Sequence, residues 1–436
     1  MKKISIITLV LSFSITALAD TSLRMLSFGS EMGPGITEPG IMGFGISPNG
    51  RYVCGSIEYA AGIFIGDLET NKMLYSISDS DTGAQLLNIN NIGEAIGFDG
   101  DSGILFNIDE KETALRSSEK LSYIIGQDIS DDGSVQVGML VSDSFQTYPA
   151  YSKDGGIWEI LPMPDIDLGY YNQKQVAARY VSSDGKIILG NIGTWGPATL
   201  WRLNETGEFI PDPIFDGYVM MSREDVEKPY FRFTPEGMSP DGHYILIEVC
   251  TYNDGASSLT MPAVYDTHTK VLKVYDEVQN IDYSESGLHP TAIDNNGTFI
   301  GMIGSGSFNM GAFIMYAGET QAQMYTEAFP EYADVFECLD LGGYHMPSDI
   351  SADGRFILGN GWYTPSDDPM ANDAIYYFMT YVIDTGNTNS VGNHNEETMP
   401  IVPTEYYTLD GIRVDNPVKG LNIIRMSNGT FRKILK

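Results

Sequence analysis

The amino-acid sequence repeats one short phrase seven times, and this repetition constrains the possible folds more than any other feature. The phrases read "GISPNGRYVCG" at 45–55, "NINNIGEAIG" at 88–97, "DISDDGSVQVG" at 128–138, "YVSSDGKIILG" at 180–190, "GMSPDGHYILI" at 237–247, "AIDNNGTFIG" at 292–301 and "DISADGRFILG" at 349–359. Successive copies are separated by 40 to 57 residues. A period of this size, built from β-forming residues, is typical of the blades of a β-propeller.

The chemistry of the phrase predicts a tight β-hairpin. Ser, Asp or Asn opens a type I turn, and a glycine in the left-handed conformation closes a three-residue loop with a bulge. The seven turn glycines are Gly50, Gly93, Gly133, Gly185, Gly242, Gly297 and Gly354. An apolar run such as Lys186–Leu189 follows each turn, which suits a strand buried on both faces between neighbouring blades.

Each phrase is followed by a second strand-like element that ends in a polar turn. Examples are "AGIFIGDLETNK" at 61–72 and "PATLWRLNETGE" at 197–208, and a further short strand often comes next, as at Val271–Tyr275. With the strand before the glycine turn, each repeat contains four strands, as a propeller blade requires. We therefore predict an all-β protein, a seven-bladed β-propeller over residues 20–386, with a small C-terminal β segment. No long stretch has helical periodicity, and we expect no membrane span after the N-terminus.

The two ends of the chain differ from the repeats. Residues 1–19 combine two lysines, an apolar run and the small-residue site Ala17-Leu18-Ala19, which is typical of a secretory signal peptide and predicts a secreted or cell-surface protein. Residues 387–402 are polar and predict a linker. Residues 403–436 carry six basic and three acidic side chains with hairpin signals at Asp410-Gly411 and Asn428-Gly429.

The seventh repeat lacks a fourth strand, because its apolar residues end at Ile383 before the polar linker begins. The segment 22–28 is strand-like and has no other place. We predict that it forms the outer strand of the blade that contains Asp349–Asp384. This pairing would close the ring and remove an exposed edge.

Composition limits the partners. The formal net charge of −33 makes nucleic acid a poor partner. The three cysteines, Cys54, Cys250 and Cys338, fall in different repeats, and we expect them to be buried and unpaired. The five histidines are scattered without ligand spacing, so we predict no metal site and no cofactor.

Loop lengths favour one face of the propeller for binding. Connections within the hairpins are short on one face, while the connections on the other face are long and aromatic, and variable loops commonly carry function. Aromatic side chains there would stack on sugars or on apolar peptide side chains, or would simply pack the loops. The candidate ligand-binding residues on this long-loop face are Tyr170, Tyr171, Trp195, Tyr230, Tyr252, Phe308, Tyr344, Trp362 and Tyr363.

Two functions remain open from the residues alone. The sequence has no Gly-x-Ser-x-Gly elbow, no His-Glu-x-x-His helix and no phosphate-binding glycine loop, so the catalytic residues, if any, are unknown. We favour a non-enzymatic module that binds an extracellular glycan, peptide or other surface partner through the long-loop face. The alternative is a propeller hydrolase or lyase acting on polysaccharide or peptide, with carboxylates meeting in the central funnel.

Two family resemblances add to this interpretation. The repeats resemble the TolB-type propeller repeat, which combines Ser-Pro-Asp-Gly with an apolar strand, and the secreted HAF repeat, which matches Gly311-Ala312-Phe313 and Pro197-Ala198. The tail phrases "YYTLDGIRV", "KGLNII" and "RKILK" resemble the end of the C-terminal sorting domains of Bacteroidetes. That resemblance implies export by the type IX secretion machinery. Neither resemblance specifies a ligand.

Overall fold

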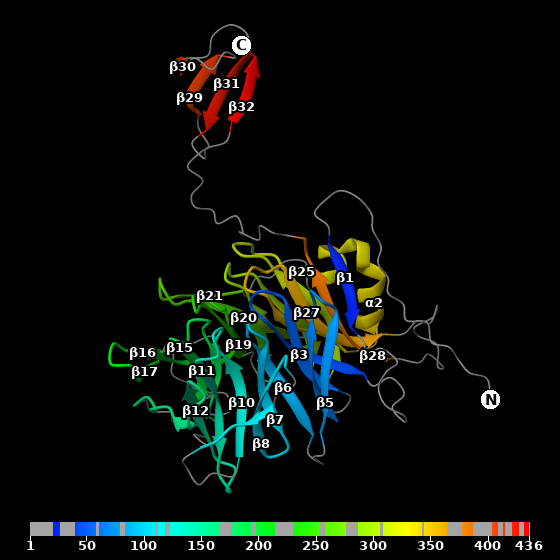
Figure 1. Ribbon diagram of the computed structural model, residues 1–436. Coiled ribbons are helices and arrows are strands. Elements are labelled where there is room, and N and C mark those ends of the chain that lie inside the picture. Colours follow the sequence, from blue (N-terminus) through cyan, green and yellow to red (C-terminus); the bar gives the residue numbers. More distant parts are fainter. Residues whose placement is uncertain are drawn as a thin grey trace, which may run out of the picture. The chain divides into compact units, whose positions relative to one another are not determined.

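The computed structural model describes 21–26, 40–57, 61–78, 83–109, 112–117, 123–165, 176–192, 198–213, 230–252, 258–275, 287–305, 308–341, 344–363, 377–386, 403–408, 413–414, 421–426 and 431–435. The described strands form seven four-stranded antiparallel sheets and one separate sheet near the C-terminus. The seven sheets are arranged around a central channel as the blades of a β-propeller (Figure 1). The predicted fold class is confirmed.

The first three blades run along the chain from the innermost strand to the outermost. Their strands are β2 (Ile41–Ile46), β3 (Tyr52–Ile57), β4 (Gly62–Asp67) and β5 (Lys72–Ile77); β6 (Ala84–Ile89), β7 (Glu94–Asp99), β8 (Ser102–Asn107) and β9 (Glu112–Ala114); and β10 (Tyr123–Ile129), β11 (Val135–Val141), β12 (Thr147–Lys153) and β13 (Glu159–Ile160). In the first and third blades the second strand is the most buried, because neighbouring blades stack face to face on it. In β3 every residue is buried.

The next three blades repeat the same order. Their strands are β14 (Val176–Val181), β15 (Ile187–Ile192), β16 (Ala198–Leu203) and β17 (Phe209–Pro213); β18 (Tyr230–Met238), β19 (Tyr244–Tyr252), β20 (Ser258–Asp266) and β21 (Val271–Val274); and β22 (Gly287–Ile293), β23 (Phe299–Ser305), β24 (Phe308–Met315) and β25 (Gln323–Met324). The hydrophobic core therefore lies mainly between blades. One cluster joins Leu189 and Leu200 of the fourth blade to Ile245 and Ile247 of the fifth.

The seventh blade is built from both ends of the propeller sequence. β26 (His345–Ile350), β27 (Phe356–Tyr363) and β28 (Tyr377–Asp384) are completed by β1 (Ser22–Leu26), in the order β1-β28-β27-β26. β1 pairs antiparallel with β28, from Ser22 opposite Asp384 to Leu26 opposite Thr380 (Figure 1). The predicted closure by the N-terminal strand is confirmed for the described part of 22–28, and residues 27 and 28 lie outside the described residues.

A short helical connection separates the sixth and seventh blades, and the sequence analysis did not anticipate it. It contains α1 (Tyr325–Ala328), a 3₁₀ turn η2 (Pro330–Tyr332) and α2 (Ala333–Leu341). Phe336 and Leu339, three residues apart on α2, are fully buried against the sixth and seventh blades. Such a short helix has too few turns to show a clear period in the sequence. None of the described helices is long and apolar enough to span a membrane.

The seven glycine turns have the predicted conformation. All seven glycines have positive φ angles between 68° and 86°. In the first blade the backbone N–H of Gly50 donates to the carbonyl of Ser47 over 2.7 Å, and the Ser47 hydroxyl accepts from the N–H of Tyr52 over 2.9 Å. The side chain of the opening residue thus fixes the hairpin, as expected from its chemistry.

Hydrogen bonds link these turns from blade to blade in a closed ring, in which Asn90 Nδ2 joins the second blade to the third by donating to the carbonyl of Ser130 over 3.2 Å. In several turns, the residue that follows the opening Ser or Asp donates its backbone N–H to the carbonyl of the equivalent residue in the next blade. Ser183 donates in this way to Pro240, and Ala352 to Pro48. Pro48 and Pro240 have no N–H to donate. At these two places the following residue donates to an asparagine side chain of the next blade, from Asn49 to Asn91 over 2.7 Å and from Asp241 to Asn295 over 2.9 Å. Proline in one blade is therefore matched by asparagine in the next.

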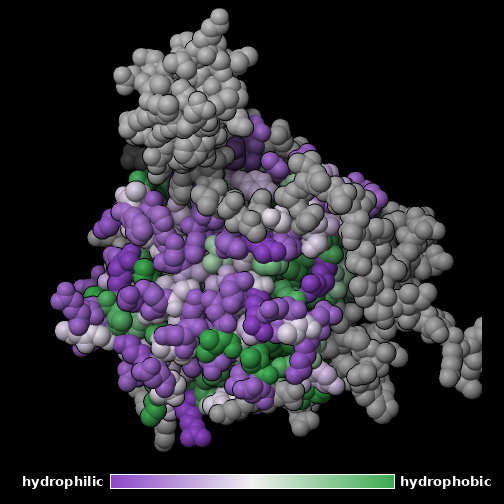
Figure 2. Space-filling model, turned by 45° about the horizontal axis from the view of Figure 1, so that its top comes forward, coloured by the Kyte–Doolittle hydropathy of each residue, from purple (hydrophilic) through white to green (hydrophobic). Residues whose placement is uncertain are grey.

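The contacts divide the chain into two compact units, Met1–Ser390 and Val391–Lys436. In the second unit β29 (Pro403–Thr408), β30 (Arg413–Val414), β31 (Leu421–Met426) and β32 (Phe431–Leu435) form a sheet in the order β30-β29-β31-β32. On the described surface in view, hydrophilic side chains predominate and hydrophobic ones form small separate patches (Figure 2). The three cysteines are buried and form no disulfide with one another, as predicted.

Candidate functional site

The central channel contains a cavity of about 280 Å³ that all seven innermost strands line. The cavity lies where these strands end and the glycine turns begin, because Pro48, Asp131, Ser183 and Pro240 of the turns also line it. It is therefore at the end of the channel that carries the short turns. From the sequence we expected a binding site on the opposite, long-loop face.

A β-bulge in each innermost strand turns one extra side chain toward the channel. The register of each of these strands against its neighbour shifts at the same place, as between Gly126 and Asp128 of β10 or Ala178 and Tyr180 of β14. A bulge adds one residue and redirects its side chain. The bulged residues are Phe44, Leu87, Gln127, Arg179, Glu236, Thr291 and Ser348, and all except Glu236 line the cavity.

These bulged residues were not predicted from the sequence, although their constant distance from the glycine turn could have identified them. Each bulged residue stands three positions before the Ser, Asn or Asp that opens the glycine turn, as Arg179 stands before Ser182 and Gln127 before Ser130. The offset is constant while the residue type varies. Variation at a fixed structural position is what a ligand-binding ring on a repetitive scaffold requires.

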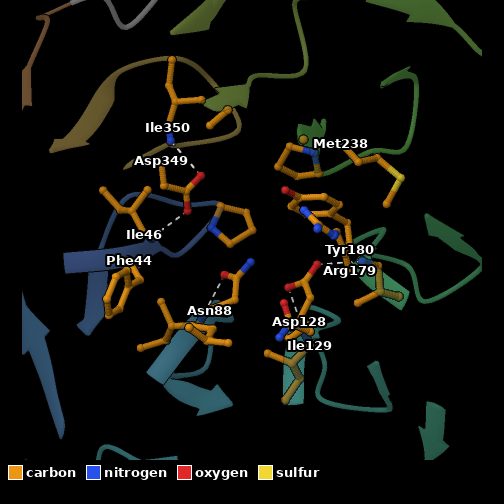
Figure 3. A pocket seen from close by; sticks show the side chains of 18 of the residues that line it. Phe44, Ile46, Asn88, Asp128, Ile129, Arg179, Tyr180, Met238, Asp349 and Ile350 are labelled. Atoms are coloured by element: carbon orange, nitrogen blue, oxygen red, sulfur yellow. Dashed lines mark hydrogen bonds between the residues drawn. The ribbon is translucent and has the colours of Figure 1, made fainter. Parts of the chain in front are cut away.

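Three neighbouring blades supply polar groups to one side of the cavity. Arg179 is the one cation among the residues that line it, and its Nε donates to Asn191 Oδ1 over 3.0 Å. Within the described part of the chain, neither guanidinium Nη of Arg179 has an acidic partner and the Gln127 amide has no hydrogen bond. Asn88 Oδ1 accepts from the backbone N–H of Ile89 over 2.7 Å, which leaves its NH₂ group as a donor (Figure 3).

Two carboxyl groups in the channel wall have a different role. Asp128 Oδ1 accepts the N–H of Ile129 over 2.8 Å, and its Oδ2 accepts the N–H of Val181, in the next blade, over 2.7 Å. Asp349 repeats this arrangement with the N–H groups of Ile350 and Ile46, each over 2.8 Å (Figure 3). Each carboxyl therefore joins its blade to the following one. Asp349 does so at the junction where the ring closes.

The environment of these carboxyl groups changes their acidity. Desolvation by burial raises the pKa of Asp128 to about 8 and that of Asp349 to about 7, although the backbone N–H donors act in the opposite direction. The negative charges of Asp349 and Asp131 also raise the pKa of Asp128 by repulsion. Values near neutrality suit proton transfer. However, both oxygens of each group already accept backbone hydrogen bonds.

The candidate residues on the long-loop face are only partly described. Tyr170, Tyr171 and Trp195 lie outside the described residues. Tyr230, Tyr252, Phe308 and Tyr363 lie on described strands without described side chains. Tyr344 and Trp362 are half-buried, and their rings pack on Phe378, with centroids 5.4 Å and 5.8 Å from it. The structure thus brings these two together through a third aromatic residue that the sequence analysis did not name.

Two of the scattered histidines also come together. His243, in a glycine turn, and His268, between β20 and β21, lie beside Asp266 at the end of β20. Their separation of 25 residues in the sequence showed no ligand spacing. The other two described histidines pair elsewhere: the buried His345 through Nδ1 with Asp340 over 2.6 Å, and the half-buried His289 through Nδ1 with Glu248 over 2.9 Å.

The channel, its seven blades and its N-terminal closing strand define the class of the protein, a seven-bladed β-propeller. No protein-family model matches the chain, and no relative is found among curated proteins. Solved structures similar to it include an oligogalacturonate lyase in complex with manganese, at 12% identity and a TM-score of 0.50, with 85% of this chain and 98% of that one covered.

Two further solved structures are similar to the propeller. Puromycin hydrolase, as an S511A mutant complexed with PGG, has 11% identity and a TM-score of 0.50 over 91% of this chain and 58% of that chain. TolB from Acinetobacter baumannii has 12% identity and a TM-score of 0.35 over 64% of this chain and 60% of that chain. At such identities the likeness shows the fold alone.

Proposed function

We propose that this protein is an exported, non-enzymatic binding propeller whose channel cavity takes a small polar ligand, or the end group of a larger one, that carries a carboxylate. The observation that carries the proposal is the Arg179 guanidinium, which faces the cavity without an acidic partner among the described residues. An arginine presents a planar fork of donors that matches a carboxylate.

The groups beside Arg179 fit such a ligand. Gln127 and Asn88 offer amide donors from the two preceding blades, so a carboxylate and an adjoining hydroxyl or carbonyl find several donors on one side. Phe44 and Met238 provide apolar surface in the same cavity. Ligand sites are typically apolar hollows with a few placed polar groups, from about 300 to 1,000 Å³. At about 280 Å³ this cavity suits one sugar ring or one amino-acid residue.

The state of the channel carboxyl groups favours binding over catalysis. A general acid or base must present an oxygen to the substrate. In Asp128 and Asp349, both oxygens accept backbone N–H groups that join adjacent blades. Hydrolase or lyase chemistry with these carboxylates would require those inter-blade bonds to break.

The proposal also includes export of the protein and a second, aromatic binding surface on the long-loop face. The signal-like residues 1–19 support export, and the tail at 403–436 supports use of the type IX machinery in a Bacteroidetes host. The long-loop face, with Tyr344 and Trp362 around Phe378, is a second aromatic surface at the opposite end of the channel, and it would take a separate glycan or peptide.

Calorimetry with matched ligand pairs tests the proposal. The pairs are galacturonic acid against galactose, and a dipeptide with a free carboxylate against its amide. We expect one acidic member to bind more tightly than its neutral counterpart, and Arg179→Gln to remove that preference. Arg202→Gln is the matched control, because Arg202 pairs with Asp212 over 3.0 Å outside the cavity.

The same experiment separates the alternatives. Equal binding to wild type and Arg179→Gln, or no binding of either acid at millimolar concentration, would contradict the channel site. Release of products from oligogalacturonate or peptide, abolished by Asp128→Asn, would instead establish an enzyme with funnel carboxylates.

A further inference from the structure

Three blades share an ion-pair unit on the short-turn face. The residue after the turn glycine lies beside an aromatic ring of the next residue and pairs with an aspartate at the end of the third strand. In the first blade Arg51 lies over Tyr52, 4.9 Å from its centroid, and bonds Asp67 over 3.0 Å. In the seventh blade Arg355 bonds both oxygens of Asp384 over 2.8 Å and lies over Phe356.

The fifth blade has the same unit with different chemistry. His243 stacks on Tyr244 with centroids 4.0 Å apart, and its Nε2 lies 3.2 Å from Asp266 Oδ1. Asp266 therefore takes the position of Asp67. Its Oδ1 accepts the N–H groups of His268 and Thr269 over 2.8 and 3.0 Å, just as Asp67 Oδ1 accepts those of Glu69 and Thr70.

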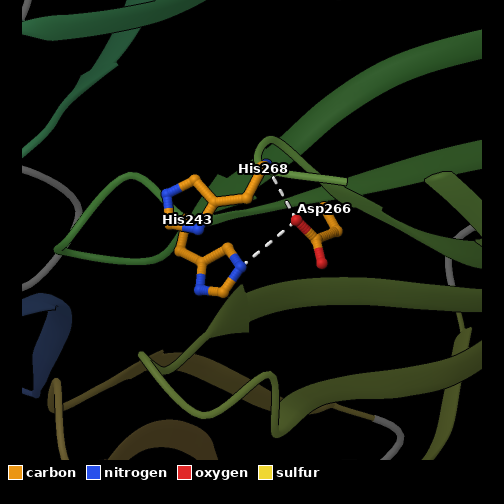
Figure 4. A group of neighbouring side chains, drawn as sticks. All are labelled: His243, Asp266 and His268. Atoms are coloured by element: carbon orange, nitrogen blue, oxygen red, sulfur yellow. Dashed lines mark hydrogen bonds and ion pairs between the residues drawn. The ribbon is translucent and has the colours of Figure 1, made fainter. Parts of the chain in front are cut away.

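The correspondence extends to the third member of the unit. In the first blade Arg51 also bonds Glu69, over 3.1 Å. In the fifth blade His268 takes the position of Glu69 and stacks on His243, with centroids 4.0 Å apart (Figure 4). Even the backbone matches, since Asn71 and Lys270 at the end of the two turns have positive φ angles of 57° and 60°. An Arg-Asp-Glu set has thus become a His-Asp-His set on the same scaffold.

We propose that His243, Asp266 and His268 form a binding site for a divalent transition-metal ion of the zinc class. Two imidazoles and one carboxylate are ligands that such ions prefer, whereas calcium and magnesium prefer oxygen ligands alone. One ligand atom from each residue lies within 4.8 Å of the other two. Water would complete a tetrahedral shell around these three protein ligands.

The local structure holds the Asp266 carboxylate in place, while the exposed His268 ring can still rotate. Asp266 is held by the backbone of its own turn, because its Oδ1 accepts the N–H groups of His268 and Thr269. The stacked imidazoles do not aim their nitrogens at one point, so binding requires the exposed His268 ring to rotate.

A bound ion would do in the fifth blade what arginine does in the first and seventh. It would connect the turn between the first two strands of the blade to the turn between the last two. The site lies on the short-turn face and shares no residue with the channel cavity. Its occupation is therefore independent of the proposed ligand of the channel.

Zinc titration of the untagged, full-length chain tests the inference, with a chromophoric chelator as competitor. We expect one Zn²⁺ per chain, a rise of the thermal midpoint with zinc, and a cobalt spectrum of tetrahedral type. His268→Ala and His243→Arg should each weaken zinc binding by at least about tenfold, since even the loss of an outer-shell group costs that much. His243→Arg also restores the arginine found in the other two blades, so it should fold normally.

Two further variants make the test specific. His394→Ala, outside the cluster, should leave zinc binding unchanged. The double variant Arg51→His/Glu69→His copies the cluster into the first blade and should bind a second Zn²⁺. The site would be overturned if zinc still binds to both His268→Ala and His243→Arg, or if the wild type does not bind zinc at 100 micromolar. Equal affinity for Ca²⁺ would overturn the assignment of the site to ions of the zinc class.

Discussion

Closure of the ring by β1 makes a quantitative prediction about one side chain. Leu26 is 6% exposed and packs with Ile41, Leu358 and Val382, so it connects the N-terminal strand to the first and seventh blades. Truncating a buried leucine to alanine costs about 3 kcal/mol from lost burial and the cavity that remains. At an unfolding entropy of about 2 cal/mol/K per residue, this corresponds to a fall of about 4 °C in the thermal midpoint of a propeller this size.

The matched control lies two residues away on the same strand. Arg24 is exposed, and its guanidinium donates to the carbonyl of Leu68 over 2.8 Å. Arg24→Ala should change the free energy of unfolding by less than about 0.5 kcal/mol, as exposed substitutions usually do. Calorimetry of both variants measures the difference between a buried and an exposed position of one strand.

Hydrogen exchange shows whether the loss spreads around the ring. If closure makes the blades cooperative, Leu26→Ala should lower the protection of β15 in the fourth blade by the same free energy as that of β28. Loss of protection in the seventh blade alone would refute the reasoning, because it would mean that the ring opens locally without weakening the other blades. An unchanged thermal midpoint would refute it as well.

Three further predictions follow from other parts of the chain. Gly50→Ala should destabilise the protein much more than Gly207→Ala. Both glycines have positive φ, but a Cβ at Gly50 would lie 2.1 Å from the Phe356 side chain, whereas a Cβ at Gly207 would have no atom within 4 Å. Similar denaturation midpoints for the two variants would contradict this. The raised pKa of about 8 for Asp128 means that the folded state holds its proton more tightly than the unfolded state, so the free energy of unfolding should fall as pH rises from about 4 to about 8. Asp128→Asn should flatten that slope in urea titrations across pH, and an unchanged slope would count against the assignment. Deleting 391–436 should leave the thermal midpoint of the first compact unit unchanged while the protein accumulates in the periplasm of a host with type IX secretion; normal surface display would remove the proposed role of the tail.

Local chemistry explains why so much of the fold could be predicted. A glycine turn such as Ser239–Gly242 is specified by its own residues, because Gly alone enters the left-handed conformation freely and the serine hydroxyl bonds its own hairpin. Seven such turns therefore predict seven blades. Counting strands also predicted the pairing of 22–28 with the last blade, since an unpaired edge is unfavourable. The short helix α2 was missed because its stability comes from burial of Phe336 and Leu339 against two blades.

The candidate sites depended on contacts that no short stretch of sequence contains. Arg179 and Gln127 meet because the ring places consecutive blades side by side and a bulge turns one residue of each toward the channel. His243 and His268 meet because the two short turns of one blade lie on the same face. The turns, the number of blades and the closing strand could be read from the sequence, since each depends on neighbouring residues or on a count of strands. Which side chains share a cavity or a cluster depended on the folded structure, because strand pairing within a blade and the stacking of neighbouring blades bring together residues that are far apart in the sequence.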